Sequence, residues 1–304
     1  MKTFISMTLF AQLLLSFPQF ATNASCVNQP PKKTEPKSLV WVDGIKNAYP
    51  RWSKDGKRIL FQSNRNGKWQ IYTMNSDGSG EQRITNDSSN NDFPDWSPDN
   101  ARIAFVSDRG GDEDVYTMKM DGTDLHNLSH HPGRDIHPYW TPDGKSIIFN
   151  SNRDDSNAFE IYETGEDGKG LRRLTHTTAT ETCTRMSPDG KSIVYLHGDT
   201  NDEVFIADAA GHNARNITNT TAAEGWPAWS PDGKEIVYSS DSPGTFSLFL
   251  MDSGGGHKRQ ISTPEKPLRD CRPMISPDGK WIVFNRENNQ TIGIFVMRFP
   301  SGTK

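Results

Sequence analysis

The sequence is poor in cysteine, in excess charge of either sign and in long hydrophobic runs. Only three of its 304 residues are cysteine, and the formal net charge is −4 with an isoelectric point near 6.1. Three cysteines are too few for a disulfide framework, and the charge balance argues against a nucleic-acid-binding protein, which would carry basic clusters. The mean hydropathy is −0.74, and after Phe20 no apolar run is long enough to cross a bilayer.

Two common catalytic signatures are missing as well. The chain has no Gly-x-Ser-x-Gly nucleophile elbow. It has no phosphate-binding glycine loop either, because Gly254, Gly255 and Gly256 fall in the turn of a repeat. What it has instead is 25 glycines and 19 prolines, with enough aromatic residues to build a core. Short strands separated by many turns are typical of all-β sandwiches, barrels and propellers.

The N-terminus has the parts of a secretory signal peptide, which we predict to occupy residues 1–25. Lys2 precedes an apolar stretch from Phe4 to Phe20, and small residues follow where cleavage would occur. A membrane anchor helix is the alternative interpretation of this segment. We therefore expect an exported protein, periplasmic or extracellular, in which the polar residues 26–37 form a linker.

Cys26 would lie at or near the new N-terminus after cleavage. The residues before it resemble a bacterial lipobox, in which the cysteine becomes lipidated, although Asn23 stands where an aliphatic residue is expected. Lipidation of Cys26 would make the protein a membrane-anchored lipoprotein, and we expect no other contact with a membrane. The remaining cysteines, Cys183 and Cys271, fall in non-adjacent repeats and are predicted to be small buried thiols.

One pattern recurs six times along the chain: a proline, any residue, an aromatic residue, then Ser-Pro-Asp-Gly and a short apolar strand. The glycine position of this pattern returns at intervals of 43 to 46 residues. The copies begin at Pro50, Pro94, Pro138, Thr184, Pro227 and Pro273. A period of this length built from short strands indicates four-stranded units that repeat radially.

Each copy predicts four strands joined by tight turns. Ser-Pro-Asp-Gly forms the first turn, because proline presets φ and glycine accepts a positive φ. The last copy lacks a fourth strand, whereas an orphan strand at residues 38–42 precedes the first copy. The sequence therefore predicts an all-β fold over residues 38–304, a six-bladed β-propeller of four-stranded blades. We expect the N-terminal strand to complete the last blade and so to close the ring.

The repeats resemble those of the TolB-like propeller family, whose blades carry Pro-x-Trp-Ser-Pro-Asp-Gly followed by Phe-x-Ser-Asp/Asn-Arg. The second element occurs here at residues 61–65, 105–109 and 149–153. The resemblance covers about residues 38–299. It implies a propeller that binds partner proteins in the cell envelope. TolB-type proteins carry an N-terminal α/β domain before the propeller, and we expect only the predicted linker in its place here.

Function is expected where the copies differ, since variable loops of repeat folds form the binding face. Three residues before each proline position the copies carry Asn47, Asn91, Asp135, Glu181, Glu224 and Asp270. At a channel mouth the four carboxylates would form a negative funnel for a basic peptide or a divalent cation; alternatively, each is a solvated loop residue. One residue before each proline position are Tyr49, Phe93, His137, Cys183, Trp226 and Arg272. This varied, partly aromatic set suits partner recognition.

Several histidines fall on the same face, in copies two to four: His130, His131, His137, His176 and His197. Some lyases that act on pectin fragments use a similar propeller with a histidine-held metal, and histidines beside carboxylates could bind a transition metal. No histidine pair here has the spacing of a metal motif. The metal candidates are therefore weak, namely His130, His137, His176 and His197, and we expect no resident cofactor.

These observations favour a non-enzymatic, exported, monomeric binding protein. We expect it to recognise a protein or peptide of the cell envelope at the loop face around the channel mouth. One alternative is a metal-dependent, lyase-like carbohydrate-active enzyme on the same propeller, and another is a small-ligand or sugar sensor. The histidines discriminate between the binding protein and the enzyme, because a metal site requires them to converge.

Overall fold

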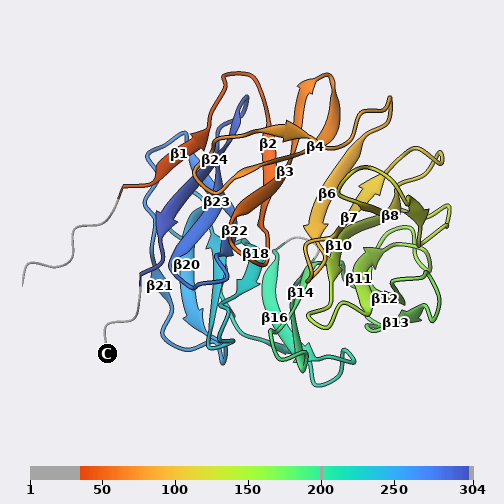
Figure 1. Cartoon of the computed structure of the whole chain (residues 1–304). Coiled ribbons are helices and arrows are strands. Elements are labelled where there is room, and N and C mark those ends of the chain that lie inside the picture. The colour runs from red at the N-terminus through yellow and green to blue at the C-terminus, as the bar shows by residue number, and fades with distance from the viewer. Residues whose placement is uncertain (1–34, 199–200, 301–304) are drawn as a thin grey trace, which may run out of the picture. The chain divides into compact units, whose positions relative to one another are not determined.

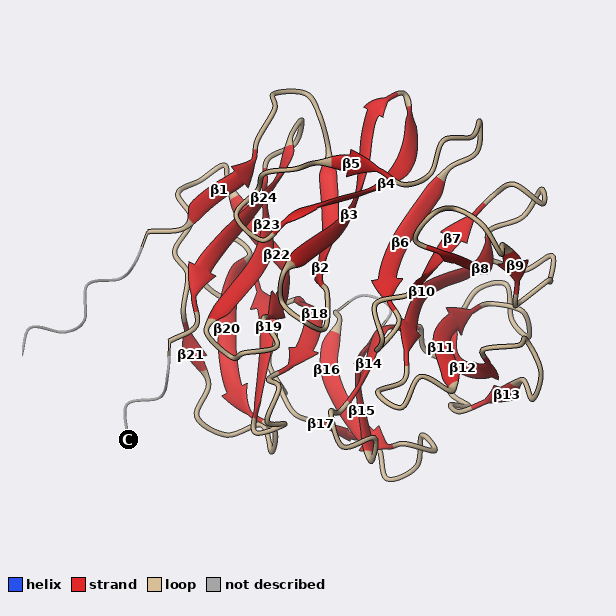
Figure 2. Cartoon of the chain, viewed as in Figure 1, coloured by secondary structure: helices blue, strands red, loops and turns tan. Residues whose placement is uncertain are grey.

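The computed structural model of the chain describes residues 35–198 and 201–300. The predicted signal peptide, Cys26 and most of the predicted linker lie outside these residues. Within them every regular element is a β-strand, and no helix is long and apolar enough to cross a membrane. The strands form six four-stranded antiparallel sheets, which Figures 1 and 2 show as separate blades. The predicted six-bladed all-β propeller is confirmed.

Each blade has three long strands and a short outer one. Blade 1 contains β2 (Asn47–Trp52), β3 (Arg58–Asn66), β4 (Lys68–Asn75) and β5 (Gln82–Arg83). Blade 2 contains β6 (Asn91–Trp96), β7 (Arg102–Ser107), β8 (Asp114–Lys119) and β9 (His126–Asn127). Blade 3 contains β10 (Asp135–Trp140), β11 (Ser146–Ser151), β12 (Glu160–Gly165) and β13 (Arg172–Arg173). Blade 4 contains β14 (Glu181–Met186), β15 (Ser192–His197), β16 (Glu203–Asp208) and β17 (Arg215–Asn216). Blade 5 contains β18 (Glu224–Trp229), β19 (Glu235–Ser240), β20 (Ser247–Asp252) and β21 (Arg259–Gln260). Blade 6 contains β22 (Arg269–Ile275), β23 (Trp281–Glu287), β24 (Ile292–Arg298) and β1 (Lys37–Val40).

The N-terminal strand closes the ring, as the missing fourth strand of the last copy predicts. Strand β1 pairs antiparallel with β24, and Lys37 lies opposite Val296 (Figure 1). Leu39 and Val40 pack against the apolar cluster between blades 6 and 1. This pairing covers the edge of β24, which would otherwise present unpaired backbone groups to another chain.

The apolar core lies between the blades. Six clusters of buried apolar side chains occur in the described residues, and each is shared by two neighbouring blades. Between blades 1 and 2, for example, Leu60 and Ile71 pack against Trp96 and Phe105, and all four are fully buried. Burying one such side chain contributes about 1.5–3 kcal/mol. The aromatic residue of the repeat, such as Trp52, Trp96 or Trp140, recurs because it fills these clusters.

The Ser-Pro-Asp-Gly turn is held by its own side chains. In blade 1 the Ser53 hydroxyl donates to the Asp55 carboxylate at 2.6 Å and accepts from the Arg58 amide at 2.9 Å. Gly56 takes a φ of 70°, which glycine adopts without strain. The hydroxyl–aspartate bond recurs in all six turns, from serine in five of them and from Thr141 in blade 3. The repeated aspartate is therefore a turn-stabilising residue.

Candidate functional site

The innermost strands of the six blades surround the central channel and run between two faces of the propeller. Each innermost strand contacts the innermost strands of both neighbouring blades. We call the end where these strands begin the loop face, because the preceding blade connects there. The other end carries the Ser-Pro-Asp-Gly turns, and we call it the turn face.

The residue before each proline position has the same unusual backbone in all six blades. Its φ lies between 47° and 56°, a left-handed conformation that non-glycine residues rarely adopt. The register between the innermost strand and its neighbour shifts at this point in every blade. We call this set the mouth ring: Tyr49, Phe93, His137, Cys183, Trp226 and Arg272. Strained residues of this kind cluster at functional sites, and a bulge re-aims the side chain that it carries.

The side chains of the mouth ring contact one another across the channel. The Phe93 ring packs edge-on against Tyr49 and His137, with centroids 4.7 and 4.4 Å away. The Arg272 guanidinium stacks over Trp226 at 4.5 Å and over Tyr49 at 5.0 Å. All members except the buried Cys183 are half-buried. The mouth ring thus closes the channel with an aromatic and cationic surface.

Burial and neighbouring arginines fix the charges at the mouth ring. The pKa of His137 falls to about 3, first because burial disfavours the charged imidazole and then because Arg185, Arg51 and Arg272 repel it. His137 is therefore neutral at pH 7. Arg272 is neutralised by Glu287, whose carboxylate accepts its hydrogen bond at 2.5 Å. The Nε2 atom of His137 is buried and has no hydrogen-bond partner among the described residues.

A second layer lies below the mouth ring. Side chains alternate along a strand with a period of two, so the residue two positions further on also faces the channel. We call this layer the inner ring: Arg51, Asp95, Tyr139, Arg185, Ala228 and Met274. The repeat pattern alone does not single out the inner ring, although these positions vary as widely among the copies as the mouth ring does.

The four acidic residues that the sequence placed at the channel mouth are buried inside the blades. Asp135, Glu181 and Asp270 are fully buried, and Glu224 is 3% exposed. Neither a negative funnel nor a set of solvated loop residues describes this arrangement. The reason is the register shift between this position and the inner ring: the extra, left-handed residue interrupts the alternation, so the acidic side chain turns into the blade while the mouth ring faces the channel. A role for these four residues in partner binding stays a prediction.

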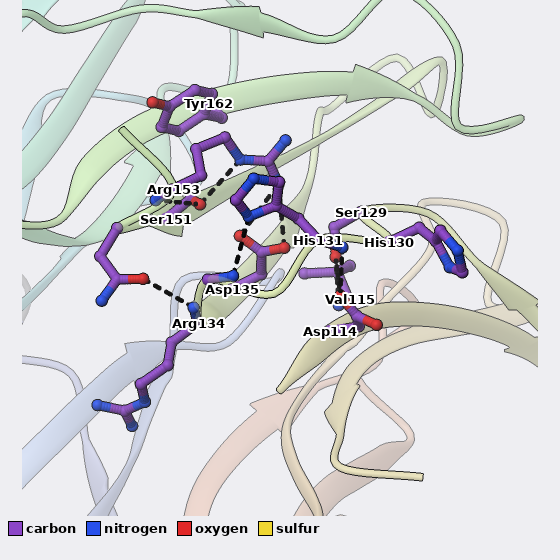
Figure 3. Close-up of polar contacts among 12 residues, drawn as sticks. Asp114, Val115, Ser129, His130, His131, Arg134, Asp135, Ser151, Arg153 and Tyr162 are labelled. Carbon is purple, nitrogen blue, oxygen red and sulfur yellow. Dashed lines mark hydrogen bonds and ion pairs between the residues drawn. The ribbon is translucent and has the colours of Figure 1, made fainter. Parts of the chain in front are cut away.

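Arginine braces the equivalent position in the first three blades. The Arg153 guanidinium donates to both oxygens of Asp135 at 3.0 and 3.1 Å, and it stacks over Tyr162 at 5.0 Å. Figure 3 shows Arg153 between Asp135 and Ser151. Arg65 and Arg109 bond to Asn47 and Asn91 in the same way. In blade 6 the arginine is Arg286, which comes from a different position of the repeat. It donates one hydrogen bond to each carboxylate oxygen of Asp270.

Blades 4 and 5 lack this arginine. The repeat position carries Asp199 in blade 4 and Ser242 in blade 5. Glu181 bonds instead to His197 at 3.2 Å, and Glu224 accepts from Thr220 at 2.8 Å. One oxygen of each glutamate is buried without a hydrogen-bond partner among the described residues. Burial raises the pKa of both carboxyls, to about 7 for Glu224.

The candidate metal-binding histidines do not converge. His137 faces the channel, His197 pairs with Glu181, and His176 is exposed. Figure 3 shows His131 beside the Asp135–Arg153 pair and His130 pointing away from it. Across residues 35–198 and 201–300, no three His, Cys, Asp or Glu side chains are grouped so that they could hold a metal ion. Cys183 and Cys271 are free buried thiols, as the sequence predicts.

Comparison with known proteins agrees with this architecture. A family model described as the TolB β-propeller domain matches residues 19–130, 88–203 and 195–304. Among solved structures, TolB from Acinetobacter baumannii is 25% identical with a TM-score of 0.68, over 79% of this chain and 59% of that one. This chain therefore spans less than two thirds of the Acinetobacter protein.

Two further solved structures are similar in fold. A putative TolB from Agrobacterium tumefaciens is 22% identical with a TM-score of 0.66, over 85% of this chain and 91% of that one. An oligogalacturonate lyase in complex with manganese is 13% identical with a TM-score of 0.60, over 87% and 93%. No protein of curated function matches the sequence. Because the family model spans the six repeats, the chain belongs to the TolB β-propeller family.

Proposed function

We propose that the protein is an exported, non-enzymatic binding module that recognises a polypeptide partner at its loop face, with the mouth ring as the contact surface. The observation that carries the proposal is the mouth ring itself. Six positions hold large or reactive side chains in a left-handed backbone where glycine would be free of strain. Strain of this kind costs about 1 kcal/mol or more at each position. Proteins keep such a cost mainly where the side chain contributes to function.

The chemistry of the mouth ring fits protein recognition. Tyrosine, tryptophan and arginine are the residues that contribute most at protein–protein interfaces, and here Tyr49, Trp226 and Arg272 form one stacked group. Because the cation of Arg272 is already paired with Glu287, the surface is close to neutral. It therefore suits an aromatic or aliphatic side chain of the partner better than the basic peptide that an acidic funnel would bind.

The buried carboxylates contribute to this proposal from beneath the surface. Asp135 and Asp270, each held by an arginine, fix the start of β10 and β22. These strand starts carry the loops that surround the mouth ring. Membership of the TolB β-propeller family supports a role in the cell envelope, and the signal peptide predicted at residues 1–25 supports export.

The experiment is a pull-down from envelope extract with immobilised protein and matched variants. We expect Trp226→Ala and Tyr49→Ala to reduce partner recovery at least about tenfold, the usual effect of removing an interface anchor. Val42→Ala is the control: Val42 is 52% exposed in the loop between β1 and β2, and its replacement should leave partner recovery unchanged. Equal recovery by all four proteins, each first shown to unfold at a similar temperature, would contradict the proposal.

A further inference from the structure

The turn face has a pocket of its own at the other end of the channel. Its volume is about 370 Å³, which falls in the range of small-molecule sites. The inner ring forms its floor through Tyr139, Arg185, Ala228 and Met274. We call it the turn-face pocket.

The rim of the turn-face pocket is apolar with one basic interruption. Five of the six Ser-Pro-Asp-Gly turns contribute their proline, namely Pro98, Pro142, Pro188, Pro231 and Pro277. In the first copy Lys54 takes the place of the proline. Its ammonium group lies 5.9 Å from the centre of the Tyr139 ring, so this cation is directed over the pocket floor.

The lining is cationic although the whole chain is acidic. It includes Lys54 and Arg185 and no carboxylate, whereas the formal net charge of the chain is −4. The aspartates of the surrounding turns do not line this pocket. Those of blades 3 to 6 lie within 4.0 Å of the lysine that follows them in the turn. A concave surface of one sign attracts a ligand of the other sign.

The guanidinium of Arg185 retains donors for a ligand. One nitrogen donates to the Thr184 carbonyl at 2.7 Å, and the group stacks over Tyr139 at 5.1 Å. Among the described residues no carboxylate lies within 4.0 Å of Arg185, whereas the neighbouring Arg51 lies 3.8 Å from Asp95. Arg51 is 6% exposed, and its Nε atom is buried without a hydrogen-bond partner in the described part of the chain.

A small void continues the turn-face pocket inward. Its volume is about 10 Å³, and Arg51, Arg185 and Arg272 all line it. Three guanidinium groups thus converge behind the floor of the turn-face pocket. Burial, and then the nearby Arg185, lower the pKa of Arg51 to about 9, whereas Asp95 opposes this shift.

We propose that the turn-face pocket binds a small organic anion, a carboxylate attached to a planar apolar body. The carboxylate accepts hydrogen bonds from Arg185 and faces Lys54, because arginine donates to planar carboxylates in a fixed fork. The apolar body lies against Trp229, Met274 and the proline rim. This site is on the opposite face from the mouth ring and is independent of the partner proposed there.

Calorimetric titration with a matched pair of probes tests the charge requirement. The probes are 2-naphthoate and its uncharged amide, 2-naphthamide, which share the planar body. We expect the naphthoate to bind at least about tenfold more tightly than the amide, since a charge-assisted hydrogen bond in a concave site is worth that much. Binding of the naphthoate should weaken as salt concentration rises.

Variants locate the site. Arg185→Met keeps the side-chain stem and should weaken naphthoate binding about tenfold, Arg185→Lys should restore part of it, and Lys54→Gln should weaken it a few-fold. Lys191→Gln is the control for Lys54→Gln, because it removes the same charge from a lysine that is 82% exposed on the turn face. It should leave the affinity for naphthoate unchanged.

Three results would overturn the proposal. The first is no naphthoate binding at millimolar concentration, and the second is equal binding of naphthoate and naphthamide. The third is unchanged affinity in Arg185→Met. A thermal unfolding curve of each variant without ligand shows whether a lost affinity reflects lost folding, and the Arg185→Lys variant gives an answer if Arg185→Met does not fold.

Discussion

Blades 3 and 5 solve the same structural problem in two ways. Both bury a carboxylate at the start of the innermost strand, Asp135 in blade 3 and Glu224 in blade 5. In blade 3 Arg153 neutralises the charge from within the same blade. In blade 5 the equivalent position is Ser242, and burial raises the pKa of Glu224 to about 7. Burial raises the pKa of both carboxyls, but in blade 3 Arg153 opposes the rise, whereas in blade 5 no arginine does so.

The difference shows which interactions the repeat can lose. The apolar clusters on both sides of blade 3 and of blade 5 are equally complete. A buried charge that loses its partner can be neutralised by protonation, whereas a missing apolar side chain would leave a cavity. The polar partner of this buried carboxyl can therefore differ from blade to blade while the fold stays the same.

The largest expected effect comes from breaking the pair in blade 3. Arg153→Ala should lower the free energy of unfolding by about 3 kcal/mol at pH 7, because it leaves Asp135 buried without its cation. Chemical denaturation measures this change. Arg172→Ala is the matched control: it removes an arginine from an ion pair in which that arginine is 56% exposed, and it should cost less than about 1 kcal/mol. Equal losses in both variants would remove the distinction between the two blades.

The second prediction concerns the unpaired carboxyl in blade 5. The folded pKa of Glu224 lies near 7, above its ordinary value of 4.5, so the folded protein holds a proton that the unfolded chain releases. This contribution to stability is present below pH 4.5 and is lost as pH rises to 7.

Glu224→Gln should remove that pH dependence. At pH 8 we expect the variant to be more stable than the natural protein by about 2 kcal/mol, because the natural protein must then bury an ionised carboxylate without a cation. Denaturation curves at pH 5 and pH 8 measure the effect. A constant difference between the two proteins at both pH values would show that Glu224 does not titrate as described.

The third prediction converts blade 5 into the type of blade 3. Ser242→Arg places an arginine at the blade 5 position that is equivalent to Arg153. The backbone there already has the same conformation, because the backbone amide of Ser242 donates to the Ser240 hydroxyl at 3.2 Å, as the amide of Arg153 does to Ser151. An aromatic pair, Tyr238 and Phe249, is present for it to stack on. We expect a gain of about 1.5 kcal/mol at pH 8. Combined with Glu224→Gln, the gain should disappear, and a persistent gain would point to a different cause.

The smallest effect tests what all blades share. Phe93 has a φ of 50°, so Phe93→Gly should be more stable than Phe93→Ala by about 1 kcal/mol. This order is the reverse of the usual one in a strand. Thermal unfolding of the two variants compares them directly, since both lose the same ring contacts. If alanine is the more stable replacement, the left-handed backbone of the mouth ring is not a source of strain.

The sequence predicts the fold well because the same strand and turn pattern occurs in six copies. Proline in the edge strand, the Ser-Pro-Asp-Gly turn and the orphan strand before Pro50 each have one consistent position in a closed propeller. Spacing also places Tyr49 and its equivalents at the channel. It does not reveal which side of the strand a residue faces after a register shift, so the buried Asp135 is misplaced to the channel mouth.

The pairing of long side chains was also beyond sequence reasoning. The motif Phe-x-Ser-Asn/Asp-Arg marks an arginine in the repeat, but only the structure shows that Arg153 reaches back eighteen residues to Asp135. The turn-face pocket was missed because its cations, Lys54 and Arg185, come from blades far apart in the sequence. Nothing in one copy of the repeat indicates that the ring brings them together.

The most direct test of the account is photo-cross-linking from the mouth ring. A photo-reactive phenylalanine analogue at position 93 changes an aromatic ring that is already half-buried at the loop face. The same analogue at position 281, on the turn face, serves as the control. The account predicts an adduct with an envelope protein from position 93 and none from position 281. Adducts from position 281 alone, or from neither position, would contradict a partner surface at the mouth ring.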